Sequence, residues 1–112
     1  MQLSSLYNAL KGLNIPVAYG YYPEEHAFPY IVYEATTSNN FAGDNYAYAK
    51  ITEIQVDLYT ENKNPSLQHS LETVLDGLDL FYEKREDYVS SENCFAVSYT
   101  FEILEEQETN GE

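Results

Sequence analysis

The side chains of this sequence that could act as nucleophiles or proton carriers are two histidines and one cysteine. Nucleophilic catalysis needs a base beside the nucleophile, and histidine is the side chain whose pKa ordinarily lies near neutrality. His26 follows Glu24 and Glu25, a trio that offers metal ligands, although a solvated loop histidine is the better interpretation. No histidine lies near Cys94 in the sequence, so we interpret this cysteine as a small buried residue.

The carboxylates are numerous, but their arrangement does not indicate catalysis. Nineteen Asp and Glu residues alternate along predicted strands or gather in loops, as solvated charges do. Acid–base catalysis instead needs two carboxylates held in one pocket in different environments. The five glycines are scattered, and Gly43 lies within a loop and not before a helix, so no phosphate-binding loop is predicted. We therefore expect no enzyme, no cofactor and no metal site.

The charge balance excludes several partners. Nineteen acidic residues against five basic ones give a formal net charge of -14. Nucleic-acid binding depends on Lys and Arg side chains that displace counterions from phosphates, so direct binding of DNA is not predicted, and anionic membranes should repel the chain. The acidity is interpreted first as a source of solubility. The second interpretation is a surface that lies near DNA without adhering to it, or that imitates DNA.

The length and composition indicate one domain. A chain of 112 residues suits a single modest core, and its apolar runs are too short for a membrane span. The N-terminus lacks the basic start and apolar stretch of a secretory signal, and a single cysteine suits a reducing cytoplasm. We expect one α+β domain over residues 1–104. Residues 105–112 are acidic and polar, and we expect them to form a disordered tail.

Two helices are predicted from the spacing of apolar residues. The first ends near Gly12. The second is capped by Asn64 and has Pro65 at its first position, where a missing N–H costs nothing. His69 lies off its apolar stripe, on the surface or at an interface, and Gly77 indicates a close approach or an early stop. The two stripes are Leu3, Leu6, Tyr7 and Leu10, and Leu67, Leu71, Val74, Leu75 and Leu78.

Period-two alternation predicts an antiparallel sheet. Strands are expected over residues 30–36, 46–60 and 95–103, with a short edge strand at 17–22 and a short partner strand at 88–89, after the charged stretch 83–87. The strands 30–36 and 46–60 should form a hairpin whose loop, residues 38–45, projects from the domain. The predicted fold class is α+β, a mainly antiparallel sheet of four to five strands with two helices packed on one face.

Polar residues of two predicted strands should share one surface of this sheet. Successive side chains of a strand point to opposite faces, so the acidic set lies opposite the apolar set. The surface is interpreted as the solvent-exposed face of a sheet that is covered on one side only. The alternative is a surface that contacts a neighbouring subunit or lines a passage. Its residues are Glu53, Gln55 and Asp57 on one strand and Ser98, Thr100 and Glu102 on the other.

The order of these elements carries a family resemblance. A leucine-rich opening helix is followed by Pro-Val-Ala-Tyr-Gly at 16–20, Phe-Pro-Tyr-Ile-Val-Tyr at 28–33, a polar loop and Ile-Gln-Val-Asp-Leu-Tyr-Thr at 54–60. A second helix and the strand Phe-Ala-Val-Ser-Tyr-Thr-Phe-Glu at 95–102 complete the chain. Over residues 3–104 this pattern resembles the tail terminator (tail completion, minor structural) proteins of long-tailed bacteriophages and prophages.

The resemblance implies assembly and not catalysis. Such proteins form a hexameric ring on the head-proximal end of the tail tube, stop its polymerisation and join tail to head. The implied partners are copies of the chain itself, the tail-tube protein and a head-completion or connector protein, with no membrane. DNA passes through the ring without specific binding. The implied location is the tail–head junction of the virion, and the host cytoplasm before assembly.

The resemblance also suggests where interfaces lie. The projecting loop, with its lone apolar ring, is expected to contact the tube or a neighbouring subunit. The expected interface residues are Asn39, Asn40, Phe41, Asp44 and Tyr46 in and beside this loop, and Glu53 and Asp57 on the acidic strand. Two alternatives remain open, namely another neck or head-completion protein, and an acidic DNA-mimic inhibitor of a nucleic-acid-binding protein.

Overall fold

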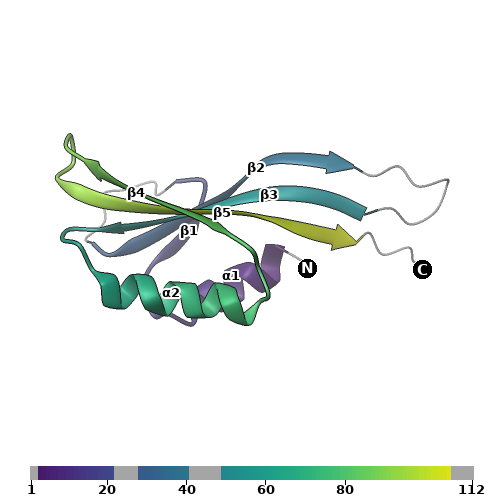
Figure 1. The fold of residues 1–112 in the computed structure, drawn as a ribbon, viewed down its shortest axis with the longest axis horizontal. Coiled ribbons are helices and arrows are strands. Elements are labelled where there is room, and N and C mark those ends of the chain that lie inside the picture. The colour runs from purple at the N-terminus through teal and green to yellow at the C-terminus, as the bar shows by residue number, and fades with distance from the viewer. Residues whose placement is uncertain (1–2, 22–27, 41–48, 107–112) are drawn as a thin grey trace.

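The computed structural model describes residues 3–21, 28–40 and 49–106, which form two helices and one five-stranded sheet. In chain order the elements are α1 (Leu3–Lys11), β1 (Val17–Tyr19), β2 (Tyr30–Asn40), β3 (Ala49–Thr60), α2 (Pro65–Gly77), β4 (Glu83–Val89) and β5 (Cys94–Glu106). The sheet order is β1-β2-β3-β5-β4, and only the β1–β2 pair is parallel. Both helices lie on the same side of the sheet (Figure 1). The predicted α+β fold class is confirmed.

Both helices begin and end close to where the sequence predicts. The Asn64 side chain accepts a hydrogen bond from the Leu67 N–H at 3.1 Å, which satisfies one of the unpaired donors of the first turn of α2. Pro65 follows directly and leaves no N–H unsatisfied. Gly77 ends α2, and a Cβ added there would meet nothing within 4 Å. Gly77 therefore marks the end of the helix, as one of the two predictions has it, and it does not accommodate a neighbouring element packed closely against the backbone.

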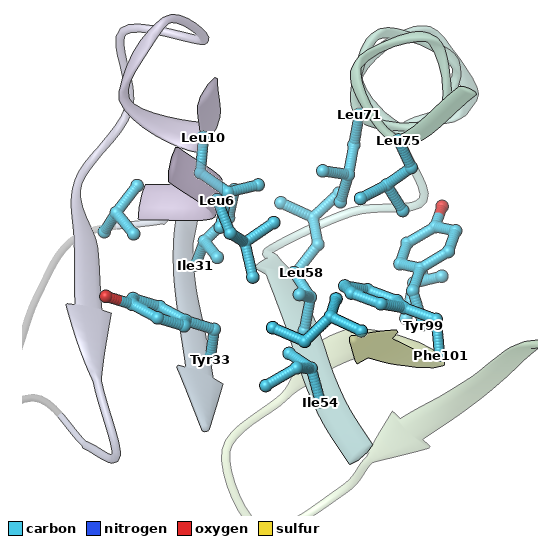
Figure 2. Close-up of a cluster of buried hydrophobic side chains, with 14 residues drawn as sticks. Leu6, Leu10, Ile31, Tyr33, Ile54, Leu58, Leu71, Leu75, Tyr99 and Phe101 are labelled. Carbon is cyan, nitrogen blue, oxygen red and sulfur yellow. The ribbon is translucent and has the colours of Figure 1, made fainter. Parts of the chain in front are cut away.

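The core lies between the two helices and one face of the sheet. Leu6 and Leu10 of α1 and Leu71 and Leu75 of α2 are fully buried. Figure 2 shows these four side chains directed at the strands, where Leu58 lies between the two pairs. The apolar halves of the alternating patterns of β3 and β5 complete this layer: Ile54, Val56 and Leu58, and Val97, Tyr99, Phe101 and Ile103.

The hairpin of β2 and β3 is confirmed, and β2 is longer than predicted; residues 46–48, the predicted start of the second strand, lie outside the described residues. The sequence predicts a loop from residue 38, whereas β2 continues through Asn40. Asn39 pairs with Ile51 and Asn40 with Lys50, because polar residues can extend a ladder when a partner strand supplies the backbone hydrogen bonds. At the other end of the chain, β5 continues to Glu106, two residues past the expected domain end at 104. Residues 107–112, the rest of the predicted tail, lie outside the described part.

The strand β4 is the largest difference from the predicted elements. The sequence predicts a charged connection over 83–87 and a strand of two residues after it, whereas the whole segment Glu83–Val89 is one edge strand. Its side chains are exposed except for that of Val89, so it carries no apolar alternation from which a strand can be read. Charged side chains along an edge also discourage unwanted pairing with other chains.

Alternate residues of β4 connect it to the helix side of the domain. Lys84 Nζ lies 2.7 Å from Glu72 Oε2 on α2, and the buried Tyr99 donates its hydroxyl proton to the same oxygen at 2.8 Å. Burial of the Glu72 carboxyl acts to raise its pKa, but the hydrogen bonds from Lys84 and Tyr99 and the Lys84 charge outweigh this effect, and the pKa is lowered. The carboxylate therefore joins α2, β4 and β5.

We predict that Glu72→Gln lowers the free energy of unfolding by about 1 kcal/mol at pH 7, through the lost ion pair and charge-assisted hydrogen bond. Because the folded-state pKa lies below the unfolded-state value, this stabilisation is present above the unfolded pKa and is lost as the pH falls through the folded one. Urea titrations between roughly pH 3 and pH 7 should show the difference between the two proteins shrinking with acid. An equal difference at every pH would contradict this account, and Glu61→Gln, an exposed carboxylate, is the control.

Candidate interaction surface

The sheet face opposite the helices is polar, as the sequence predicts. In the β3–β5 ladder Asp57 lies opposite Ser98, Gln55 opposite Thr100, and Glu53 opposite Glu102. Both helices pack on the other face, so they leave this one uncovered (Figure 1). We call it the open face; its residues are Glu34, Thr36, Glu53, Gln55, Asp57, Glu83, Arg85, Asp87, Ser98, Thr100 and Glu102.

Hydrogen bonds hold two carboxylates of the open face in place. The Ser98 hydroxyl donates to Asp57 Oδ1 at 2.6 Å, and Gln55 Nε2 donates to the two Asp57 oxygens at 3.0 and 3.2 Å. The Thr36 hydroxyl donates to Glu53 Oε1 at 2.7 Å. These donors fix the positions of the charges without neutralising them, so the face presents ordered negative charge.

The edge strands extend this acidity across the sheet. Glu34 of β2 lies opposite Gln55, and Glu83 of β4 lies opposite Thr100. Among the described residues of the open face, Arg85 is the one cation, and its Nε lies 3.0 Å from Asp87 Oδ2. Six carboxylates and one guanidinium therefore share this surface, which favours basic partners and repels phosphates.

The end of the open face beside the β4–β5 turn is aromatic. The Tyr30 and Tyr59 rings stack with centroids 4.9 Å apart, and Phe28 stacks on Tyr30 at 5.6 Å. Burial, followed by the Asp57 charge, raises the pKa of Tyr59 to about 12. The rings give this end of the face a rigid apolar surface beside the carboxylates.

Alkaline pH should weaken the fold through Tyr59. Its folded-state pKa lies above the ordinary value of 10.0, so its contribution to stability is complete below pH 10 and is lost as the pH rises towards about 12. We expect Tyr59→Phe to lose less stability over that range than the wild type, because phenylalanine does not ionise. Asp57→Asn should make this loss smaller and complete at a lower pH, since it removes a charge that raises the folded-state pKa of Tyr59 and leaves the unfolded-state pKa unchanged. Urea titrations from pH 9 to pH 12 measure both, and identical alkaline curves for all three proteins would contradict this assignment.

The structure brings together only part of the predicted interface set. Glu53 and Asp57 lie on the open face, four residues apart on β3 with Gln55 between them. Asn39 and Asn40 belong to β2, and the backbone places them at the end of the hairpin that extends away from the helices (Figure 1). The other predicted members, Phe41, Asp44 and Tyr46, lie outside the described residues.

The residues that could do chemistry are not assembled into a site in the described part of the chain. His69 is exposed on α2, and Cys94 is buried, which raises the pKa of its thiol. His26 lies outside the described residues. Within the described ranges no group of three or more His, Cys, Asp or Glu side chains is placed to hold a metal ion. No helix there has the length and apolarity to cross a membrane.

One surface residue escapes the sequence analysis. Phe81, in the connection between α2 and β4, is 93% exposed, more than any other large apolar residue in the described ranges. It lies beside a groove of about 450 Å³ at the edge of the open face. In the sequence Phe81 lies in the apolar run Leu80-Phe81-Tyr82, which resembles a buried segment, and its exposure follows from the packing of its two neighbours against the core.

Comparisons with known proteins identify a structural relative. Models of protein families give no match, and neither do the curated proteins. The fold is similar to that of a chain in the virion of a native gene transfer agent (GTA) particle, with a TM-score of 0.67. This chain shares its fold with a virion protein. The similarity covers 94% of this chain and 95% of the other at 15% sequence identity, so it extends over the whole domain and concerns the fold.

Proposed function

We propose that this chain is a structural protein of a phage-type virion that caps the head-proximal end of the tail tube, stops its polymerisation and joins tail to head. The observation that carries the proposal is the end-to-end similarity to a chain of the gene transfer agent virion, over 94% of one chain and 95% of the other. The order of helices and strands, which resembles that of tail terminators, points in the same direction. The role needs no catalytic group.

The charge of the chain suits a ring through which DNA passes. Phosphates are repelled by carboxylates, and a net charge of -14 leaves few cations on which DNA could adhere. The proposed assembly is a hexamer, in which each copy contacts its neighbours by a head-to-tail interface that closes on itself. Such a ring lets DNA slide without specific binding.

The proposed contacts of the ring lie at two places on each copy. The hairpin end of β2 and β3 extends away from the helices, and the connecting residues 41–48, including Phe41, Asp44 and Tyr46, are proposed to meet the tail tube or a neighbouring subunit. Glu53 and Asp57 on the open face are proposed to meet another chain. Two copies of the chain would not bind each other through their open faces, because each face carries six carboxylates and one cation among its described residues.

The test is the mass of the purified chain by light scattering over a concentration series, alone and with the tail-tube protein of the same virion. We expect a species of about six copies, on its own or bound to the tube. A monomer at every concentration that ignores the tube would contradict the proposal, and would favour the DNA-mimic inhibitor. A ring that binds only the head connector would identify a different neck protein.

A further inference from the structure

The groove at the edge of the open face lies where β4 begins. It has a volume of about 450 Å³ and opens between the α2–β4 connection and the two central strands. It is lined by Glu53, Asp79, Phe81, Glu83, Thr100, Phe101 and Glu102. Its lining combines an apolar wall of two phenylalanines with four carboxylates. The groove lies beside the part of β5 that extends beyond the start of β4.

The floor of the groove is a strand edge that β4 does not cover. The β4–β5 ladder starts with Glu83 opposite Thr100, and from there β4 runs towards the turn. β5 continues in the other direction through Glu106, paired with β3 on its inner side. Among the described strands, none pairs with the outer edge of β5 at residues 101–103. Such an edge presents backbone donors and acceptors to which an extended segment can add as a strand.

Phe81 is held outward beside this edge by the packing of its neighbours. Leu80 and Tyr82 pack against the core on either side of it, and the Leu80 N–H donates to the Leu75 carbonyl at 3.2 Å. Asp79 adopts a left-handed backbone conformation, with φ of 59°, which turns the chain out of α2. The ring of Phe81 is therefore exposed in a defined position, as expected for an anchor of a protein contact.

The charges of the groove identify the kind of occupant. Its carboxylates attract Lys and Arg, and three of the five cations of the chain are already paired, Lys63 with Glu86, Lys84 with Glu72 and Arg85 with Asp87, at 2.8, 2.7 and 3.0 Å. A second copy of this acidic chain thus offers little positive charge to match it. The carboxylates of the groove also repel the phosphates of DNA.

We propose that the groove binds an extended basic segment of a different protein. The segment adds as a strand beside β5 at residues 101–103. Alternate side chains of a strand point to opposite faces, so its Lys or Arg residues lie on the open-face side against Glu83 and Glu102, where their aliphatic stems cover Phe81, and the intervening apolar residues point to the opposite side, that of Phe101. The inference does not depend on ring formation. A monomer with this groove would bind the same segment.

The probe for this proposal is a short synthetic peptide of alternating lysine and valine, titrated into the full chain labelled with ¹⁵N in buffer of physiological salt. We expect amide shift changes concentrated at residues 79–83 and 100–103. A peptide of alternating glutamate and valine should cause none. Shift changes spread evenly over the acidic surface, without concentration at these two segments, would overturn the proposal.

Two pairs of substitutions separate the groove from the net charge. Glu83→Gln with Glu102→Gln should weaken peptide binding about tenfold, through the loss of two carboxylates next to bound cations. The control pair, Glu61→Gln with Glu92→Gln, changes the net charge by the same amount at exposed positions outside the groove. We expect this pair to weaken peptide binding less than about twofold. Equal weakening of peptide binding by both pairs would mean that the peptide responds to the net charge of the chain and not to the groove, and would overturn the proposal.

Phe81→Ala tests the apolar part without changing any charge. We expect binding about five-fold weaker, as for a buried aromatic anchor at the edge of a contact. Tyr21→Ala, which removes another exposed ring, should leave the affinity unchanged. Thermal unfolding of each variant checks that the fold is intact. An unaffected affinity in Phe81→Ala would overturn the assignment of this ring. None of these outcomes depends on whether the chain forms rings or caps a tube.

Discussion

Replacing Leu71 by alanine is expected to lower the free energy of unfolding by about 3 kcal/mol. Leu71 is fully buried, and α2 directs it together with Leu75 at the core face of the sheet (Figure 2). Truncation removes apolar area from the core and leaves a cavity that α2 cannot close, because the Asn64 cap and the Glu72–Lys84 pair hold the helix in place. The loss is large against the total stability of a small domain, about 5–15 kcal/mol.

Urea denaturation followed by circular dichroism measures this effect. The matched control is Phe81→Ala, which also removes a large apolar side chain, but one that is 93% exposed. We expect the control to change the free energy of unfolding by less than about 0.5 kcal/mol. Comparable losses in the two variants would mean that α2 does not cover the sheet as described.

Replacing residues 41–48 by a short glycine-serine linker is expected to abolish capping of the tail tube while leaving the domain folded. The ladder of β2 and β3 reaches Asn40 opposite Lys50, so a short linker can still close the hairpin. The proposed contact residues Phe41, Asp44 and Tyr46 are lost. With no contact to the tube, we expect tails whose length is no longer limited.

The control for this replacement is a chain that lacks residues 107–112, which should cap tubes normally. Electron microscopy of tails from virions carrying either variant gives the length distribution, and thermal unfolding confirms that each domain is folded. Tails of normal length with the linker variant would rule out the hairpin end as a contact. A linker variant that fails to fold would be replaced by Phe41→Ser with Tyr46→Ser, which leaves the loop length unchanged.

The elements with one clear period are the ones that the sequence predicts well. Leu67, Leu71 and Leu75 mark the buried side of α2, and the alternation of Ile54, Val56 and Leu58 marks β3. The shared polar surface of β3 and β5 also follows from period two, because the faces of neighbouring strands must agree when both have an apolar half. The placement of Asp57 and Ser98 on one shared polar face could therefore be predicted from the sequence.

Features that depend on tertiary pairing could not be predicted in the same way. β4 has no buried stripe, so its strand conformation comes from backbone pairing with β5 and leaves no hydrophobic pattern. Asn39 and Asn40 extend β2 because β3 is opposite them, against their own turn preference. The groove beside Phe81 arises where β4 begins at Glu83 and β5 continues beyond it, and this depends on the lengths of two paired strands.

The measurement that tests the account most directly is electron microscopy of the tail-tube protein of the same virion as it polymerises, with and without this chain. We predict that substoichiometric amounts of the chain produce tubes that carry extra density at one end and no longer lengthen. Tubes that grow to the same lengths in both samples, with no density added at either end, would contradict the proposed function.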